Sequence, residues 1–332
     1  MAFGEVMLRL SPPRRELLLQ SPHLDVWVAG AEANVITQLA RLGHDAGIVT
    51  RLPDNDLGQA ALRTLRGHGV ETGGVVLGGE RMGLYFVTPG AGARSTDVIY
   101  DRAASAFAEA AADTWDWGRL LQGVGRLHLS GITPALGQAP ADNAIAAALA
   151  ASERGVPVSF DGNWRGKLWA RWDGDARTIL GRIVEHADIL FGNHRDVALL
   201  LGREAFEECD GSRDQTAANL AFEAFPKLRA IASTQRDFTS SGGQRLSARL
   251  FRRTGRASDA SIDIHDVVDR IGSGDAFVAG VIDGLSTGAE DAAALRDGLA
   301  LAALKHSLPG DASLFSRADI EAVLAGVRDV RR

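Results

Sequence analysis

The chain has 332 residues, a net charge of −6, one cysteine, 45% hydrophobic residues and 23% charged residues. This composition is typical of a globular protein, and we interpret residues 1–332 as a single α/β domain. The absence of a basic block argues against a nucleic-acid partner, and no apolar run is long enough for a transmembrane helix. The lone Cys209 excludes an intramolecular disulfide and, with no signal-peptide pattern, predicts a cytoplasmic protein.

Short apolar segments alternate with helical periodicity along most of the chain. The segments predicted as strands are 4–10, 46–50, 126–130, 156–161, 189–192 and 230–233. The segments predicted as helices are 33–42, 57–67, 142–154, 177–186, 214–225, 273–286 and 292–307. Because strand and helix follow one another in turn, the pattern indicates βαβ units and a Rossmann-like, parallel-rich sheet flanked by helices.

One region breaks this alternation and carries no helical signal. Residues 83–89 and 94–102 read as two strands around the turn Gly90-Ala91-Gly92. Together with residues 11–29, they predict a small antiparallel sheet beside the main domain. Ligands of α/β folds bind outside the carboxyl ends of the strands, so such a sheet is suited to act as a lid. A surface hairpin without a role is the alternative.

The most informative motif runs from Asp269 to Asp275 and precedes a helical pattern. Gly272, Ser273 and Gly274 allow a tight turn whose N–H groups, at a helix N-terminus, can hold an anion. Asp275 would then lie beside that anion as a carboxylate able to accept the proton of an attacking hydroxyl. A simple helix N-cap is an equally good interpretation of the motif taken alone.

Two further polar groups lie where an α/β site is expected. Asp161, Asn163 and Arg165 follow a predicted strand, and Arg165 suits a carboxylate or phosphate. The segment Gly30-Ala31-Glu32-Ala33-Asn34 opens a helix with small residues and an amide that can bind hydroxyl groups. Taken alone, a structural ion pair and ordinary helix capping are the better explanations of these two groups.

These motifs, with Ser130-Gly131-Ile132-Thr133-Pro134-Ala135-Leu136, stand in the order found in ribokinase-like (PfkB-type) carbohydrate kinases. The chain is most similar to 2-keto-3-deoxygluconate kinases within that family. The resemblance covers nearly the whole chain. It implies a ribokinase-like fold with a β-sheet lid that often mediates dimerisation, and Mg-ATP as phosphoryl donor.

The resemblance also implies roles for individual residues. Asp275 would be the base, and Gly272, Ser273 and Gly274 the anion hole. The substrate-binding residues would be Gly30, Ala31, Asn34, Tyr85, Tyr100, Arg102, Ile132, Asp161, Asn163 and Arg165. Arg102 and Arg165 would together hold the carboxylate of a sugar acid. A neutral ketose has no carboxylate to pair with these two arginines.

The nucleotide half departs from the family pattern. The family's Asn-x-x-Glu, tied to metal and phosphate, is Asn193-His194-Arg195-Asp196 here, which makes Asn193 and Asp196 the candidate Mg²⁺ residues. The usual Lys-x-Gly turn is replaced by Ser233-Thr234-Gln235-Arg236. Candidate nucleotide contacts are therefore Ser233, Gln235, Lys305, His306 and Gly310, the last three beside the adenine.

The sequence thus predicts ATP-dependent phosphorylation of 2-keto-3-deoxygluconate at its 6-hydroxyl, in a homodimer or higher oligomer formed through the lid. A fructokinase or another ketose kinase is the alternative within the family. A catalytically silent sugar-acid sensor is the alternative outside enzymes. A dinucleotide-dependent dehydrogenase is disfavoured because no Gly-x-Gly-x-x-Gly follows the first strand.

Overall fold

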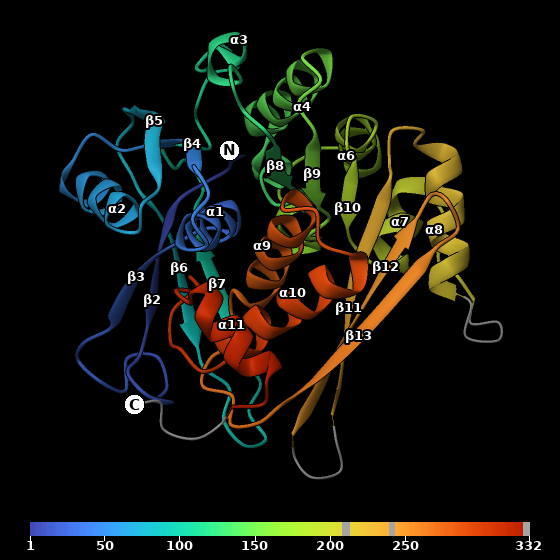
Figure 1. Ribbon diagram of the computed structural model, residues 1–332. Helices are drawn as coiled ribbons and strands as arrows, with labels where there is room; N and C mark the ends of the chain where they lie inside the picture. The colour runs from blue at the N-terminus through green and yellow to red at the C-terminus, as the bar shows by residue number, and fades with distance from the viewer. Residues whose placement is uncertain (208–212, 239–242, 328–332) are drawn as a thin grey trace.

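The computed structural model describes residues 1–207, 213–238 and 243–327 (Figure 1). Cys209 lies outside the described residues. In the described part, a nine-stranded main sheet has the order β13-β12-β11-β10-β9-β8-β1-β4-β5. Its strands are β1 (Ala2–Phe3), β4 (Gly47–Leu52), β5 (Glu71–Leu77), β8 (Leu127–Ser130), β9 (Val158–Asp161), β10 (Ile189–Phe191), β11 (Ala230–Phe238), β12 (Gln244–Arg252) and β13 (Ala257–Ile264). The pairs from β5 to β11 are parallel, which confirms the predicted parallel-rich sheet.

Helices cover both faces of the main sheet, with a separate hydrophobic cluster under each layer. One layer holds α1 (Ala31–Arg41), α2 (Asp56–Gly67), α9 (Ser273–Ser286) and α10 (Asp291–Lys305), with α11 (Arg317–Leu324) against α10. The other holds α3 (Trp117–Leu120), α4 (Gln138–Glu153), α6 (Ala176–Val184), α7 (His194–Leu201) and α8 (Arg213–Ala224). The short helices η1 (Pro134–Leu136) and α5 (Gly166–Trp169) complete the set. None of the described helices has the length and apolar content to cross a bilayer.

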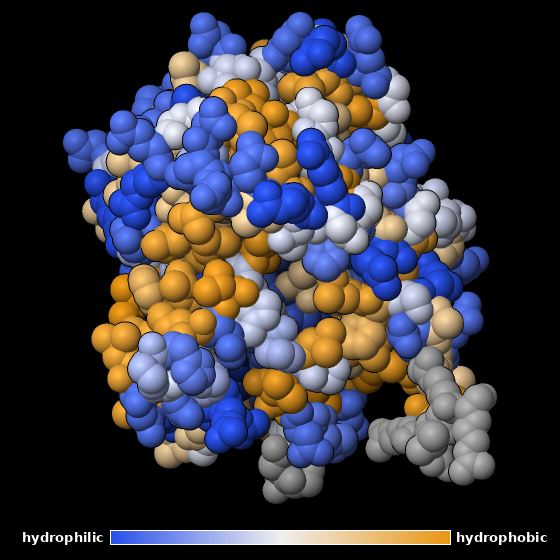
Figure 2. All heavy atoms as spheres, turned by 90° about the vertical axis from the view of Figure 1, so that its left-hand side faces the viewer, coloured by the Kyte–Doolittle hydropathy of each residue, from blue (hydrophilic) through white to orange (hydrophobic). Residues whose placement is uncertain are grey.

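A second, smaller sheet lies beside the main one, as predicted, and we call it the lid sheet (Figure 1). Its strands, in spatial order, are β3 (Asp25–Ala29), β2 (Met7–Ser11), β6 (Gly83–Thr88) and β7 (Asp97–Asp101). The outer pairs β3–β2 and β6–β7 are antiparallel, whereas the central pair β2–β6 is parallel. Figure 2 views the molecule from this side and shows hydrophobic residues gathered on the lower half of the face.

The single strand predicted over residues 4–10 is wrong, because the chain leaves one sheet and enters the other within it. Ala2 and Phe3 pair in the main sheet, while Met7–Ser11 forms β2 in the centre of the lid sheet. At the break, a Cβ on Gly4 would lie 2.2 Å from the Glu32 carboxyl group, so only glycine fits there. The apolar pattern is the same in both strands and does not reveal the break.

The strands β5, β12 and β13 have no counterpart among the predicted elements. β5 contains Gly73-Gly74, a pair that weakens the signal of a strand. β12 and β13 extend the sheet as a long antiparallel ribbon after β11, visible at the lower right of Figure 1. The predicted strand over 230–233 covers only the first part of β11, which continues to Phe238.

Candidate active site

The glycine-rich loop before α9 adopts the shape that the sequence predicts. Gly272 has φ 80° and packs so closely that a Cβ there would lie 1.9 Å from the Asp311 carbonyl oxygen. Asp269 fixes the loop by accepting hydrogen bonds from the N–H groups of Ile271 (3.0 Å) and Gly310 (3.2 Å). No described side chain caps α9, so the loop presents the positive end of this helix to a ligand.

Asp275 lies in the first turn of α9 and does not act as its cap. Its Oδ2 accepts a 2.7 Å hydrogen bond from the Asn34 side-chain amide on α1. Burial raises the pKa of Asp275 to about 7, although the Asn34 hydrogen bond and the Arg165 charge both oppose the shift. A carboxyl group that titrates near neutrality can accept a proton and release it again at physiological pH.

Asp161 is the last residue of β9. Its Oδ1 accepts a 3.2 Å hydrogen bond from the N–H of Asn163, which has φ 35°, a conformation that asparagine tolerates well. Burial, followed by the negative charges of Asp275 and Asp196, raises the pKa of Asp161 to about 8. Asp161 therefore lies close enough to Asp196 and Asp275 for their charges to disfavour its ionisation.

Arg165 is a cation that acts on all three aspartates. Its charge lowers the pKa values of Asp161, Asp196 and Asp275, yet no described carboxylate lies within ion-pair distance of it. The side chain is exposed, and its Nη1 donates a 3.3 Å hydrogen bond to the Trp164 carbonyl. The ion pair with Asp161 that the sequence allowed is absent from the described residues.

Asn193 and Asp196 form the capping box of α7. Asn193 Oδ1 accepts from the Arg195 N–H, and Asp196 Oδ2 accepts from the Asn193 N–H, each at 2.8 Å. Burial raises the pKa of Asp196. No group of three or more described histidine, cysteine or acidic side chains is arranged to hold a metal alone. Mg²⁺ is commonly held by one or two carboxylates, water and substrate phosphates, and the Asp161–Asp196 pair fits that mode.

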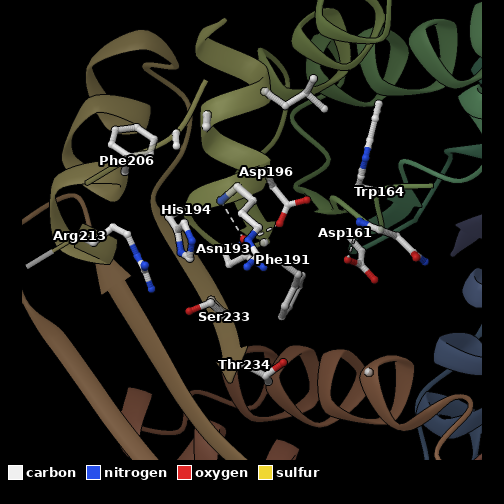
Figure 3. A pocket seen from close by; sticks show the side chains of 18 of the residues that line it. Asp161, Trp164, Phe191, Asn193, His194, Asp196, Phe206, Arg213, Ser233 and Thr234 are labelled. Carbon is white, nitrogen blue, oxygen red and sulfur yellow. Dashed lines mark hydrogen bonds between the residues drawn. The ribbon is translucent and has the colours of Figure 1, made fainter. Parts of the chain in front are cut away.

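A cavity of about 870 Å³ opens over the ends of β9, β10 and β11 (Figure 3). Asp161 and Trp164 lie at one side of it, Asn193 and Asp196 in the middle, and Ser233 on β11 below them. Gly274, in the glycine-rich loop, also lines the cavity. The structure therefore brings the predicted catalytic loop, metal residues and nucleotide residue Ser233 to one hollow.

Two of the predicted substrate residues on the lid sheet are bonded to protein carboxylates instead of facing open space. The Tyr85 hydroxyl donates to Asp311, and its ring lies 5.9 Å from that of Tyr100. The buried Arg102 donates to Glu5 through Nε (2.8 Å) and Nη2, and its Nη1 has no hydrogen-bond partner in the described part of the chain. Arg102 is thus largely neutralised by Glu5.

The remaining predicted residues divide between the cleft wall and the interior. Gly30 precedes α1 with φ 154°, where a Cβ would lie 2.3 Å from the Glu5 carbonyl oxygen, and Ala31 begins the helix. Ile132 is buried after β8. Gln235 is exposed and bonds to Asp237 on the same strand (3.1 Å).

Lys305, His306 and Gly310 support the glycine-rich loop from inside the protein. The Lys305 ammonium donates to the Leu308 carbonyl at 3.0 Å, and burial lowers its pKa. The carbonyl of His306 accepts from the N–H of Asp269 (3.2 Å), and the N–H of Gly310 donates to the same aspartate. Their contact with adenine remains a prediction.

Sequence reasoning assigned no role to several buried charged residues that shape the site. Arg9 on β2 forms ion pairs with Asp269 (2.7 Å) and Asp311 (2.9 Å) and so ties the lid sheet to the glycine-rich loop. Glu32 accepts from the hydroxyls of Ser130 (2.7 Å) and Thr133 (2.9 Å), and burial raises its pKa. Glu32 stood within the quoted Gly30–Asn34 motif, whereas no local pattern distinguishes Arg9.

Comparison with known proteins gives a consistent result over most of the chain. The family model described as pfkB family carbohydrate kinase matches residues 1–316. A 2-dehydro-3-deoxygalactonokinase of Haloferax volcanii is 34% identical over 98% of this chain and 96% of its own. A 2-dehydro-3-deoxygluconokinase of Bacillus subtilis is 30% identical over 92% of this chain and 89% of its own.

Comparison with solved structures points to the same family. The 2-dehydro-3-deoxygluconokinase of Thermotoga maritima superposes with a TM-score of 0.90 at 37% identity, covering 98% of both chains. The fold is therefore ribokinase-like, with the parallel-rich main sheet and the separate small sheet that the sequence predicted. Because the family model matches residues 1–316 and a relative is 34% identical over nearly the whole chain, the chain belongs to the pfkB family of carbohydrate kinases.

Proposed function

We propose that the chain catalyses ATP-dependent phosphorylation of 2-keto-3-deoxygluconate (2-dehydro-3-deoxygluconate) at its 6-hydroxyl. The observation that carries this proposal is Asp275, a carboxylate of pKa about 7 held by Asn34 in the uncapped first turn of α9. The names of the relatives support a 2-keto-3-deoxy sugar acid as the substrate class.

The reaction needs one proton acceptor and one set of anion ligands. Asp275 accepts the proton of the 6-hydroxyl while that oxygen bonds to the γ-phosphorus of ATP and the bond to the leaving ADP breaks. The N–H groups of Gly272, Ser273 and Gly274 stabilise the negative charge on the transferring phosphoryl group. Mg²⁺, held through Asp161, Asp196 and Asn193 together with phosphates, would neutralise further phosphate charge.

Arg165 is the residue that we assign to the substrate carboxylate. It is exposed, and no described acid is within ion-pair distance, so its guanidinium is available to a ligand. Arg102 is already paired with Glu5, so we assign it a lesser part than the sequence suggested. This pairing favours the alternative of a ketose kinase, because an arginine paired with Glu5 has less charge to offer a substrate carboxylate. Relatives named fructokinase, which match at 30% identity, support the same alternative.

A substrate panel decides between these alternatives. ADP release would be measured for 2-keto-3-deoxygluconate, its galactonate epimer, fructose and ribose at equal concentrations. We expect the gluconate-derived acid to give the highest kcat/KM. Higher kcat/KM with fructose would establish the ketose kinase, and sugar-acid binding without ADP release would establish a silent sensor.

A further inference from the structure

Arg236 lies on β11 and contacts the glycine-rich loop, and no role has been assigned to it so far. Its Nη2 lies 3.4 Å from the hydroxyl of Ser273, the first residue of α9. It also lines a cavity of about 490 Å³ that shares Asn193, Ser233 and Thr234 with the larger one. Its guanidinium is therefore near both the loop and the hollow in front of it.

His306 holds this guanidinium in place. Its Nδ1 lies 2.5 Å from the Ala302 carbonyl oxygen, an acceptor, so Nδ1 carries the proton and donates it. Burial lowers the pKa of His306 to about 4, which keeps the ring neutral at physiological pH. Its Nε2 is then a lone-pair acceptor, and Arg236 Nη2 lies 3.3 Å from it.

Arg236 lies close enough to Arg270 for the two positive charges to interact. Burial and the nearby Arg270 lower the pKa of Arg236, and no described carboxylate is within ion-pair distance of it. Its Nε is buried and has no hydrogen-bond partner among the residues that the structure describes. Desolvating a cation without a partner is costly, so a site of this kind favours binding of an anion.

Other arginines of the same antiparallel ribbon show the contrast. Arg245 pairs with Asp263 (2.8 Å), Arg249 with Asp214 (3.5 Å), and Arg252 with Asp291. These three lie on β12, whereas Arg236 lies on β11 beside the loop. Of these four described arginines, Arg236 is the one without a carboxylate within ion-pair distance, and it contacts Ser273 at the start of α9.

We propose that Arg236, positioned by His306, binds the phosphate chain of the nucleotide at the glycine-rich loop. The proposal rests on the function proposed above, since it requires a nucleotide donor. A planar guanidinium with several donors suits phosphate oxygens, and binding would satisfy the unpaired charge. The segment Ser233-Thr234-Gln235-Arg236 lacks the lysine of the expected Lys-x-Gly turn, and Arg236 would supply a positive charge there instead.

Calorimetric titration with ADP and with adenosine tests this assignment in the full chain without requiring turnover. Arg236→Met keeps much of the aliphatic stem and removes the charge, so it should raise the Kd for ADP about 10- to 100-fold. The Kd for adenosine should stay within about twofold, because adenosine has no phosphate. Arg236→Lys should recover part of the loss. Arg245→Met, an exposed arginine of the same ribbon, is the matched control and should bind ADP like the wild type.

The role of His306 is tested by a double-mutant cycle. His306→Ala should weaken ADP binding less than Arg236→Met, and the two changes together should cost little more than Arg236→Met alone, because they act through one contact. Additive losses would show that His306 does not position Arg236.

Other outcomes overturn the assignment of Arg236 itself. An unchanged ADP affinity in Arg236→Met, or equal weakening of ADP and adenosine, would show that the guanidinium does not bind phosphate. Wild type that binds ADP but phosphorylates no sugar acid would defeat the proposed substrate and leave Arg236 intact. Wild type that binds no ADP would defeat both.

Discussion

Four arginines near the candidate site divide into two pairs with different surroundings. Arg9 and Arg102 are buried and bonded to carboxylates of the protein. Arg165 and Arg236 have no described carboxylate within ion-pair distance; the charge of Arg165 lowers the pKa of Asp275, and Arg236 contacts Ser273. The first pair has its charge satisfied by the fold, which indicates a structural role. The second pair leaves its charge for ligands.

The same comparison separates the two halves of the site. The proposed acceptor side holds the carboxyl groups of Asp161, Asp196 and Asp275, whose pKa values are raised, a shift that the charge of Arg165 opposes in part. The proposed donor side carries the neighbouring arginines Arg236 and Arg270. A phosphoryl donor with negative charge matches the second half, and a hydroxyl that must lose a proton matches the first.

The largest expected effect is at Asp275, the acceptor-side residue whose role is chemical. Asp275→Asn keeps the shape and the contact with Asn34 but cannot accept a proton. We expect kcat to fall about 10²- to 10⁴-fold, with little change in melting temperature. Steady-state kinetics beside thermal unfolding checks this, and kcat near the wild-type value would remove Asp275 as the base.

The structural pair is tested at Arg9. Arg9→Met leaves Asp269 and Asp311 buried without their counter-ion, so the free energy of unfolding should fall by about 3–5 kcal/mol. Denaturant unfolding measures this change. The double variant Arg9→Met with Asp311→Asn should recover part of the loss, and Arg245→Met should change it by less than about 1 kcal/mol. A fully stable Arg9→Met protein would contradict a structural role.

The ligand pair is tested on the acceptor side at Arg165. Arg165→Ala should raise KM for the sugar acid about 10- to 100-fold, because a charge-assisted hydrogen bond is lost, while KM for fructose should hardly change. Lysine at this position should restore only part of the affinity. Equal losses for acid and neutral sugar, in step with a lower melting temperature, would place Arg165 with Arg9 and Arg102 instead.

The pH dependence sharpens the same point. Asp275 must be ionised to act as a base, and its pKa is about 7, so kcat/KM should fall about tenfold per pH unit below neutrality. The Arg165 charge lowers this pKa, so Arg165→Ala should move the acidic limb of the profile to higher pH. A limb that stays in place would show that Arg165 does not influence Asp275.

The smallest effect on catalysis is expected at the outer face of the lid sheet, where the sequence predicted dimerisation. Val26, Leu10, Phe86 and Ile99 lie in register across it, and Val26 and Ile99 are 55% and 51% exposed. We expect light scattering to show a dimer at micromolar concentration and Ile99→Asp to yield monomers. A monomeric wild type would contradict the prediction.

Local sequence determined many of the helices and central strands and the motifs of the candidate site. Alternating apolar and helical patterns were sufficient to predict the parallel-rich sheet, because burial on a given face imposes a period on neighbouring residues. The glycine-rich loop was predictable for a related reason, since its shape depends on residues next to one another, such as the positive φ of Gly272.

Tertiary structure decided how the charges are paired and where the chain changes sheets. Glu5 neutralises Arg102, 97 residues away, and Arg236 meets Ser273, 37 residues away. The switch of residues 2–11 from one sheet to the other likewise depends on strands far along the chain. Such contacts follow from packing between distant segments, which leaves no period or spacing in the sequence. Which arginines remain free for ligands is therefore a property of the folded protein.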